Sequence, residues 1–187
     1  MFPILRQIAR IGCITEPAPA ADDALRVTQQ RLDAAMRTKL GRALVIRHVD
    51  AGSCNACELE IHALGNPYYN LEALGIKFAA SPRHADLLLV TGPVAKNMEV
   101  ALRRAYDATP EPRLVVAVGD CGCTGGLFGE SYASCGKVAN VIPVDVAIPG
   151  CPPTPLDLMG GTLPVLRVVN GESTEPAAAP PLAPRPP

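Results

Sequence analysis

Four cysteine residues stand where their thiols could bind one metal centre. Two of them, Cys54 and Cys57, form a C-x2-C pair shortly after the apolar run 43–49. Two single cysteines, Cys121 and Cys151, follow later apolar runs. Apolar runs that alternate with helical segments predict a parallel sheet whose strands are buried on both faces. Because the carboxyl ends of parallel strands lie along one edge of the sheet, the sequence predicts that the four thiols meet there.

The spacing of these cysteines favours one kind of centre over another. A set of four thiolates suits either zinc or an iron–sulfur cluster. Structural zinc sites usually use two C-x2-C pairs, whereas this chain has one such pair and two single cysteines. A cluster is larger than a single ion and accepts ligands from distant loops, so we favour it over a zinc-binding scaffold. Glycines beside the cysteines would let backbone N–H groups approach the cluster sulfurs: Gly52, Gly119, Gly122 and Gly150.

The remaining cysteines allow further interpretations. Cys123 competes with Cys121 as the third ligand, and Cys121 is preferred because it lies closer to the end of its apolar run. Cys13 and Cys135 have no matching partners and are interpreted as small buried hydrophobic residues. A single C-x2-C pair also suits a thioredoxin-like dithiol, but that interpretation leaves Cys121 and Cys151 without a role.

Glu58 follows the C-x2-C pair at the expected start of a helix. The helix dipole would stabilise a carboxylate at this position. The alternative is a proton carrier beside the cluster, and the residues alone favour the first interpretation. The three histidines show no metal-ligand spacing and are treated as ordinary residues: His48, His62 and His84.

Composition excludes several classes of protein. The chain has 187 residues, of which 48% are hydrophobic, and this suffices for one packed domain with terminal extensions. A net charge of −1 and only 4% aromatic residues argue against a nucleic-acid-binding surface. The seven cysteines are an odd number and no secretory signal is visible, so a disulfide framework is not expected. No apolar run is long enough to cross a bilayer, and the paired thiols suit a reducing, cytoplasmic setting.

Hydrophobic patterning predicts an α/β fold in a single domain, with an open parallel sheet and helices on both of its faces. Strands are expected at 43–49, 76–80, 86–91, 114–118 and 141–148. Helices are expected at 57–64, 68–74, 96–107 and 155–169, and the polar stretch 25–40, with sparse apolar positions, is a further helical candidate.

The predicted domain organisation has three parts. Residues 1–41 form an N-terminal amphipathic segment and linker, 42–170 the metal-binding domain, and 171–187 a disordered tail rich in Pro and Ala. Apolar residues recur at helical spacing near the N-terminus: Phe2, Ile4, Leu5, Ile8 and Ile11. Such a helix suits packing on its own domain, on a partner subunit or on a membrane interface.

Five stretches together resemble one known family. They are GSCNACE at 52–58, SPRHAD at 81–86, LVTGPV at 89–94, VGDC at 118–121 and IPVDVAIPGCPPTP at 142–155. The family is the small electron-transfer subunit shared by respiratory complex I, as its 20 kDa subunit, and by membrane-bound [NiFe] hydrogenases of the energy-converting and formate hydrogenlyase type. The resemblance runs from about 42 to 169. It implies a flavodoxin-like domain with one [4Fe-4S] cluster, whose ligands fall on Cys54, Cys57, Cys121 and Cys151.

The resemblance also implies a branch of the family. The spaced pair Cys54 and Cys57 is similar to that of hydrogenase small subunits, whereas complex I members usually carry two adjacent cysteines. Seven cysteines do not suffice for three four-cysteine clusters, so the one-cluster, membrane-associated type is implied. The alternative is a cluster subunit of a complex I-like quinone oxidoreductase without a nickel partner.

In the hydrogenase branch, the cluster lies close to a [NiFe] centre in a separate large subunit. The resemblance implies that this protein passes electrons between that centre and a ferredoxin-like iron–sulfur subunit. Glu58 matches a family glutamate implicated in proton movement. The N-terminal segment would lie towards integral membrane subunits, which implies a peripheral oxidoreductase subunit on the cytoplasmic face of the cell membrane.

Overall fold

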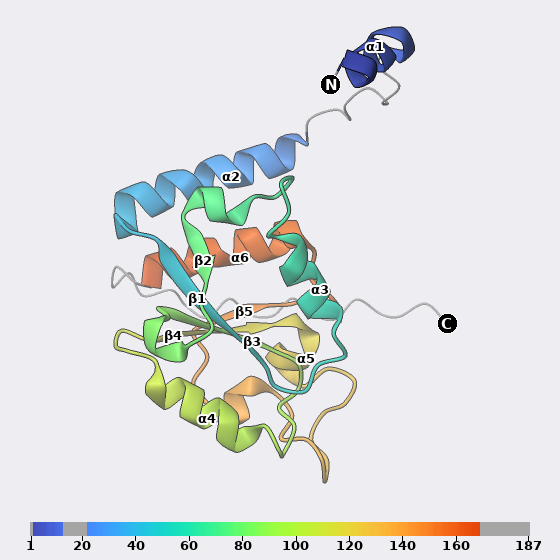
Figure 1. The fold of residues 1–187 in the computed structure, drawn as a ribbon. Coiled ribbons are helices and arrows are strands. Elements are labelled where there is room, and N and C mark those ends of the chain that lie inside the picture. The colour runs from blue at the N-terminus through green and yellow to red at the C-terminus, as the bar shows by residue number, and fades with distance from the viewer. Residues whose placement is uncertain (1, 13–21, 169–187) are drawn as a thin grey trace.

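A parallel sheet forms the centre of the computed structural model, which describes residues 2–12 and 22–168 (Figure 1). Within these residues the sheet has five strands in the order β2-β1-β3-β4-β5, and all neighbouring pairs are parallel. The strands are β1 (Leu44–Asp50), β2 (Ile76–Phe78), β3 (Leu87–Thr91), β4 (Leu114–Val118) and β5 (Val146–Ile148). This order is that of flavodoxin-like folds and confirms the predicted fold class.

The two central strands explain why the sequence shows continuous apolar runs. Every residue of β3 and of β4 is buried, and Leu87 of β3 pairs in register with Leu114 of β4. A strand with helices on both sides has no solvent-facing side, so both sets of alternating side chains must be apolar.

Helices cover the two faces of the sheet, and two separate cores lie beneath them. Helices α2 (Asp23–Ala35), α3 (Ala56–Ala63) and α6 (Pro155–Val168) pack on one face, and α4 (Glu99–Ala108) packs on the other (Figure 1). The chain also forms α1 (Phe2–Ile11) and the short α5 (Gly119–Thr124). Single turns of other helix types occur at Met36–Leu40, Leu71–Leu74, Pro82–His84 and Val138–Asn140.

Helix α2 belongs to the packed body of the protein. Asp22 caps its N-terminus by accepting hydrogen bonds from the backbone N–H groups of Ala24 and Leu25 at 3.0 and 3.2 Å. Leu25 and Leu32 are buried in the core shared with α3 and α6. The packed body therefore begins N-terminal to residue 42. The tail 171–187 lies outside the described residues, as does most of the expected linker, and the three-part domain division stays a prediction.

Two expected elements were wrong in extent, and one helix was missed. The strand expected at 141–148 is present only as β5, because Val141 and Ile142 are buried in the α4-side core without joining the sheet. The helix expected at 68–74 is a single turn at Leu71–Leu74. Helix α5 was not expected, and it carries Cys121.

Candidate metal centre

The first cysteine loop begins where β1 ends. Asp50 turns the chain by accepting hydrogen bonds from the N–H groups of Gly52 and Ser53, both at 2.8 Å. Cys54 follows as an exposed residue, and Cys57 lies half-buried in the first turn of α3. The C-x2-C pair therefore spans the junction between a strand end and a helix start.

The second cysteine loop lies against the first. Gly119, at the end of β4, has φ of +79°, a conformation that L-residues with side chains rarely adopt. A Cβ atom on Gly119 would lie 2.7 Å from Sγ of Cys57. Glycine is required here because the backbone before Cys121 runs directly beside a thiol of the first loop.

The third cysteine loop is joined to the second by a reciprocal pair of hydrogen bonds. The N–H of Asp120 donates to the carbonyl oxygen of Gly150 at 2.8 Å. The N–H of Gly150 donates to Oδ1 of Asp120, also at 2.8 Å. These bonds fix the loop of Cys121 relative to that of Cys151. Sequence reasoning missed Asp120, whose one signal was its position beside Cys121.

The four thiols lie close enough together to influence one another's ionisation. Burial, followed by the neighbouring charges of Glu58, Cys121, Cys54 and Cys151, raises the pKa of Cys57 to about 12. Burial also raises the pKa of Cys121, with additional effects from Cys151 and Cys54. The structure thus brings the four cysteines to one rim of the sheet, beyond the carboxyl ends of β1, β4 and β5.

The donor set fits an iron–sulfur cluster. Within residues 2–12 and 22–168, no group of three or more His, Cys, Asp or Glu side chains lies close enough to bind a single metal ion. Thiolates are the ligands that such clusters use. Which of the cysteines bind it stays a prediction.

Two further cysteines lie on the α4 side of the sheet. Cys123 is largely buried, its S–H donates to the carbonyl oxygen of Ala117 at 3.4 Å, and burial raises its pKa to about 12. Cys135 is 8% exposed, and its S–H donates to Oε2 of Glu99 at 3.4 Å. Cys13 lies outside the described residues. Cys135 belongs to the second core, and Cys123 packs against it.

Glu58 is a buried carboxylate without a hydrogen bond. Its side chain is 8% exposed, and neither oxygen has a hydrogen-bond partner in the described part of the chain. The nearest basic atom is Nε2 of His48, 3.8 Å from Oε1 of Glu58. Nε2 of His48 also lies 3.0 Å from Oγ1 of Thr91, and burial lowers the pKa of His48. A buried carboxylate without a hydrogen-bond partner is costly, so Glu58 is a candidate for contact with a further polar group.

An exposed apolar surface adjoins the cysteines. Leu127, Phe128 and Tyr132 follow α5 and are 76%, 59% and 99% exposed. Phe128 and Cys54 line the same surface hollow. Exposed aromatic and aliphatic side chains around a functional group are typical of a surface that a partner covers.

The described residues contain no helix with the length and apolar content needed to cross a membrane.

Comparison with known proteins gives consistent matches. Residues 54–165 match the family model described as "NADH ubiquinone oxidoreductase, 20 Kd subunit". The chain is 42% identical over 137 residues to the probable membrane-bound hydrogenase subunit mbhJ of Pyrococcus furiosus, and the match covers 71% of this chain and 82% of that protein. It is 46% identical over 132 residues to a subunit of the NADH-quinone oxidoreductase of Desulfovibrio desulfuricans, and this match covers 71% of each protein.

A solved structure gives a similar result. The fold is similar to a chain of the membrane-bound sulfane sulfur reductase, an archaeal respiratory membrane complex, with a TM-score of 0.62 and 32% identity over 75% of this chain and 77% of that one. Members of the family carry an iron–sulfur cluster. The protein therefore belongs to the family of complex I 20 kDa subunits and [NiFe] hydrogenase small subunits, and is a subunit of an oxidoreductase complex.

Proposed function

We propose that this protein is the electron-transfer subunit of a membrane-bound [NiFe] hydrogenase and carries one [4Fe-4S] cluster. The observation that supports this most directly is the meeting of four thiols from three loops in a member of a cluster-binding family. The proposed ligands are Cys54, Cys57, Cys121 and Cys151. When bound, the cluster would take up and release one electron at a time.

The chain's own residues would hold the cluster and set its surroundings. Gly119 leaves room for backbone beside the Cys57 thiol, and Asp120 ties two ligand loops together. Backbone N–H groups and burial are two of the ways in which a protein tunes the potential of such a centre. The protein has no substrate turnover of its own in this proposal, because it only passes electrons.

The hydrogenase branch is supported by the spacing of the first two cysteines. The pair Cys54 and Cys57 has the C-x2-C form of hydrogenase small subunits. The second candidate is a complex I-like quinone oxidoreductase subunit, since one of the matched relatives is an NADH-quinone oxidoreductase subunit. Nickel analysis of the purified complex distinguishes the two, as does the presence of two C-x-x-C pairs in its large subunit.

A partner subunit would cover the rim that carries the cysteines. Cys54 and Cys151 are exposed, and the apolar side chains of Leu127, Phe128 and Tyr132 are largely in contact with water. The proposed partner subunits are a NiFe-binding large subunit, a ferredoxin-like iron–sulfur subunit and integral membrane subunits. Relatives belong to membrane-bound complexes, which supports a position in a membrane complex. A peripheral position on the cytoplasmic face of the cell membrane is part of this proposal.

Metal analysis tests the cofactor. Protein purified without oxygen should be brown and contain about four irons and about four acid-labile sulfides per chain. Iron, sulfide and zinc are measured on the same sample. A colourless protein with one zinc ion per chain would instead establish the alternative of a zinc-binding scaffold.

Glu58 is proposed to move protons near the catalytic centre of the partner subunit. The substitution Glu58→Gln keeps the shape of the side chain but cannot release a proton. We expect unchanged iron content and a fall in proton-dependent turnover of the assembled complex by about a hundredfold. Glu60→Gln, on the same helix, is the matched control. Turnover of Glu58→Gln equal to that of the control would show that Glu58 carries no proton.

A further inference from the structure

Helix α1 presents an apolar stripe to solvent. All described side chains of α1 are exposed, and four large aliphatic ones are 51–65% exposed: Ile4, Leu5, Ile8 and Ile11. Three of them have the spacing i, i+4 and i+7, so they lie along one side of the helix. No core residue of the described chain covers this stripe. Whatever covers this apolar stripe therefore comes from outside the described residues.

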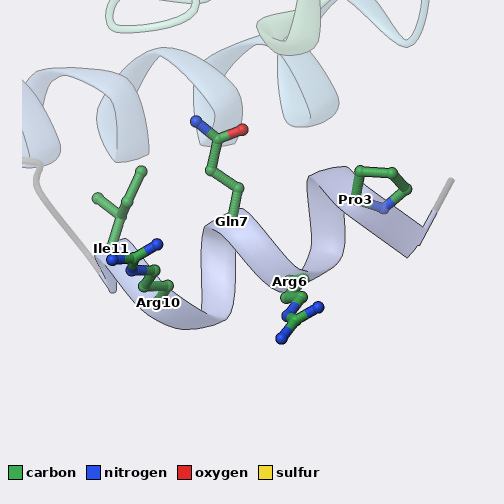
Figure 2. A pocket seen from close by; sticks show the side chains of 5 residues that line it. All are labelled: Pro3, Arg6, Gln7, Arg10 and Ile11. Atoms are coloured by element: carbon green, nitrogen blue, oxygen red, sulfur yellow. The ribbon is translucent and has the colours of Figure 1, made fainter.

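The opposite side of α1 is polar and positively charged. Figure 2 shows Pro3, Arg6, Gln7 and Arg10, which are spaced i, i+3, i+4 and i+7, together with Ile11 at the end of the helix. Among the described residues, the hollow that these side chains line takes its walls from α1. The helix contains two arginines and no acidic residue, whereas the whole chain has a net charge of −1. Helix α1 thus carries an excess of positive charge.

We propose that α1 lies on an anionic lipid surface, with its aliphatic stripe among the acyl chains and its arginines at the headgroups. A cationic helix with one apolar side binds in this way, because apolar burial and attraction to anionic lipids add together. The segment lies outside residues 54–165, so the family match does not account for it. The inference rests on the proposed membrane-bound complex and goes beyond it by naming the segment that touches lipid.

The expected strength of this contact is modest. Helix α1 has ten residues and buries few side chains, so it gives reversible binding. It would act together with the protein contacts of the complex, where linked weak contacts strengthen one another. Binding of the isolated chain is therefore measured as a partition coefficient from a lipid titration, which detects weak contacts.

The test uses the full cluster-loaded chain and flotation with vesicles. One set contains phosphatidylcholine and phosphatidylglycerol, and the other contains phosphatidylcholine alone. The unmodified chain should bind the anionic set better, and added NaCl should weaken that binding. The variant I8E should lower the partition coefficient by about tenfold or more. The double variant R6Q/R10Q should lower it by about fivefold for each arginine on the anionic set.

The matched control is V100E, which places the same charge on an exposed valine of α4. It should bind vesicles as the unmodified chain does. Equal binding by I8E and V100E, or no binding of the unmodified chain to anionic vesicles, would overturn the proposal. If I8E dissociates from the detergent-purified complex while the unmodified chain binds no vesicles, the proposal is also overturned, and the stripe is assigned to a protein partner. Iron content, measured on the same samples, reports on the proposed function separately.

Discussion

An anaerobically purified Cys54→Ser variant should contain little iron and be nearly colourless, whereas Cys135→Ser should bind as much iron as the unmodified chain. Cys54 is exposed at the rim, in the loop between β1 and α3. Serine lacks the soft sulfur that iron–sulfur clusters prefer, so one of the four proposed ligands is removed. Electron flow through the assembled complex should be lost together with the iron.

The structure explains why Cys135→Ser is a strict control. Cys135 is 8% exposed, lies in the core on the α4 side and makes one long S–H contact to Glu99 at 3.4 Å. Serine has nearly the same size and forms the same contact with its hydroxyl group. Iron per chain and the absorption of the cluster are measured for both variants. Similar iron loss in both would show that the proposed ligand set is wrong.

A second large effect is expected from Gly119→Ala. The new Cβ would meet Sγ of Cys57 at 2.7 Å and would impose a side chain on a residue with φ of +79°. The unfavourable backbone conformation costs about 1–2 kcal/mol, and the steric overlap adds about 1–3 kcal/mol. Relief of the overlap requires movement of the Cys57 thiol or of the loop that carries Cys121. We therefore expect loss of most of the iron together with a lower melting temperature.

Gly160→Ala provides the comparison for this prediction. Gly160 lies in helix α6, and a Cβ built there meets no atom within 4 Å. Alanine should stabilise the helix by about 0.5–1 kcal/mol without affecting iron content. Iron content and thermal unfolding are measured on both variants. Full iron content in Gly119→Ala would show that the close approach of the second loop to Cys57 is not needed for cluster binding.

The strands that the sequence predicted well are those buried on both faces. The run 114–118 corresponds to β4, because a fully buried strand must consist of apolar residues on both sides. The same reliance on apolar runs made the strand predicted at 141–148 too long. Val141 and Ile142 are as apolar as a strand, but they fill the core on the α4 side outside the sheet. Hydrophobicity reports burial, and it does not report which backbone groups pair.

Parts of the candidate site depended on the tertiary structure in ways that the sequence did not reveal. Helix α5 has six residues, two of them glycine, and is too short to show helical periodicity. Asp120 acts through hydrogen bonds to a residue 30 positions away, so no local pattern identifies it. The unpartnered state of Glu58 likewise depends on how α3 packs against His48. The convergence of the cysteine loops, in contrast, could be predicted, because it requires only that each cysteine follow a strand of one parallel sheet.

The order of the strands along the chain has a consequence for how the protein matures. Cys54 follows β1, whereas Cys151 follows β5, the last strand of the sheet. As long as the segment after β5 has not emerged from the ribosome, the nascent chain offers at most three of the four proposed thiols. Delivery of iron and sulfide is therefore expected to be completed only after synthesis of almost the whole domain.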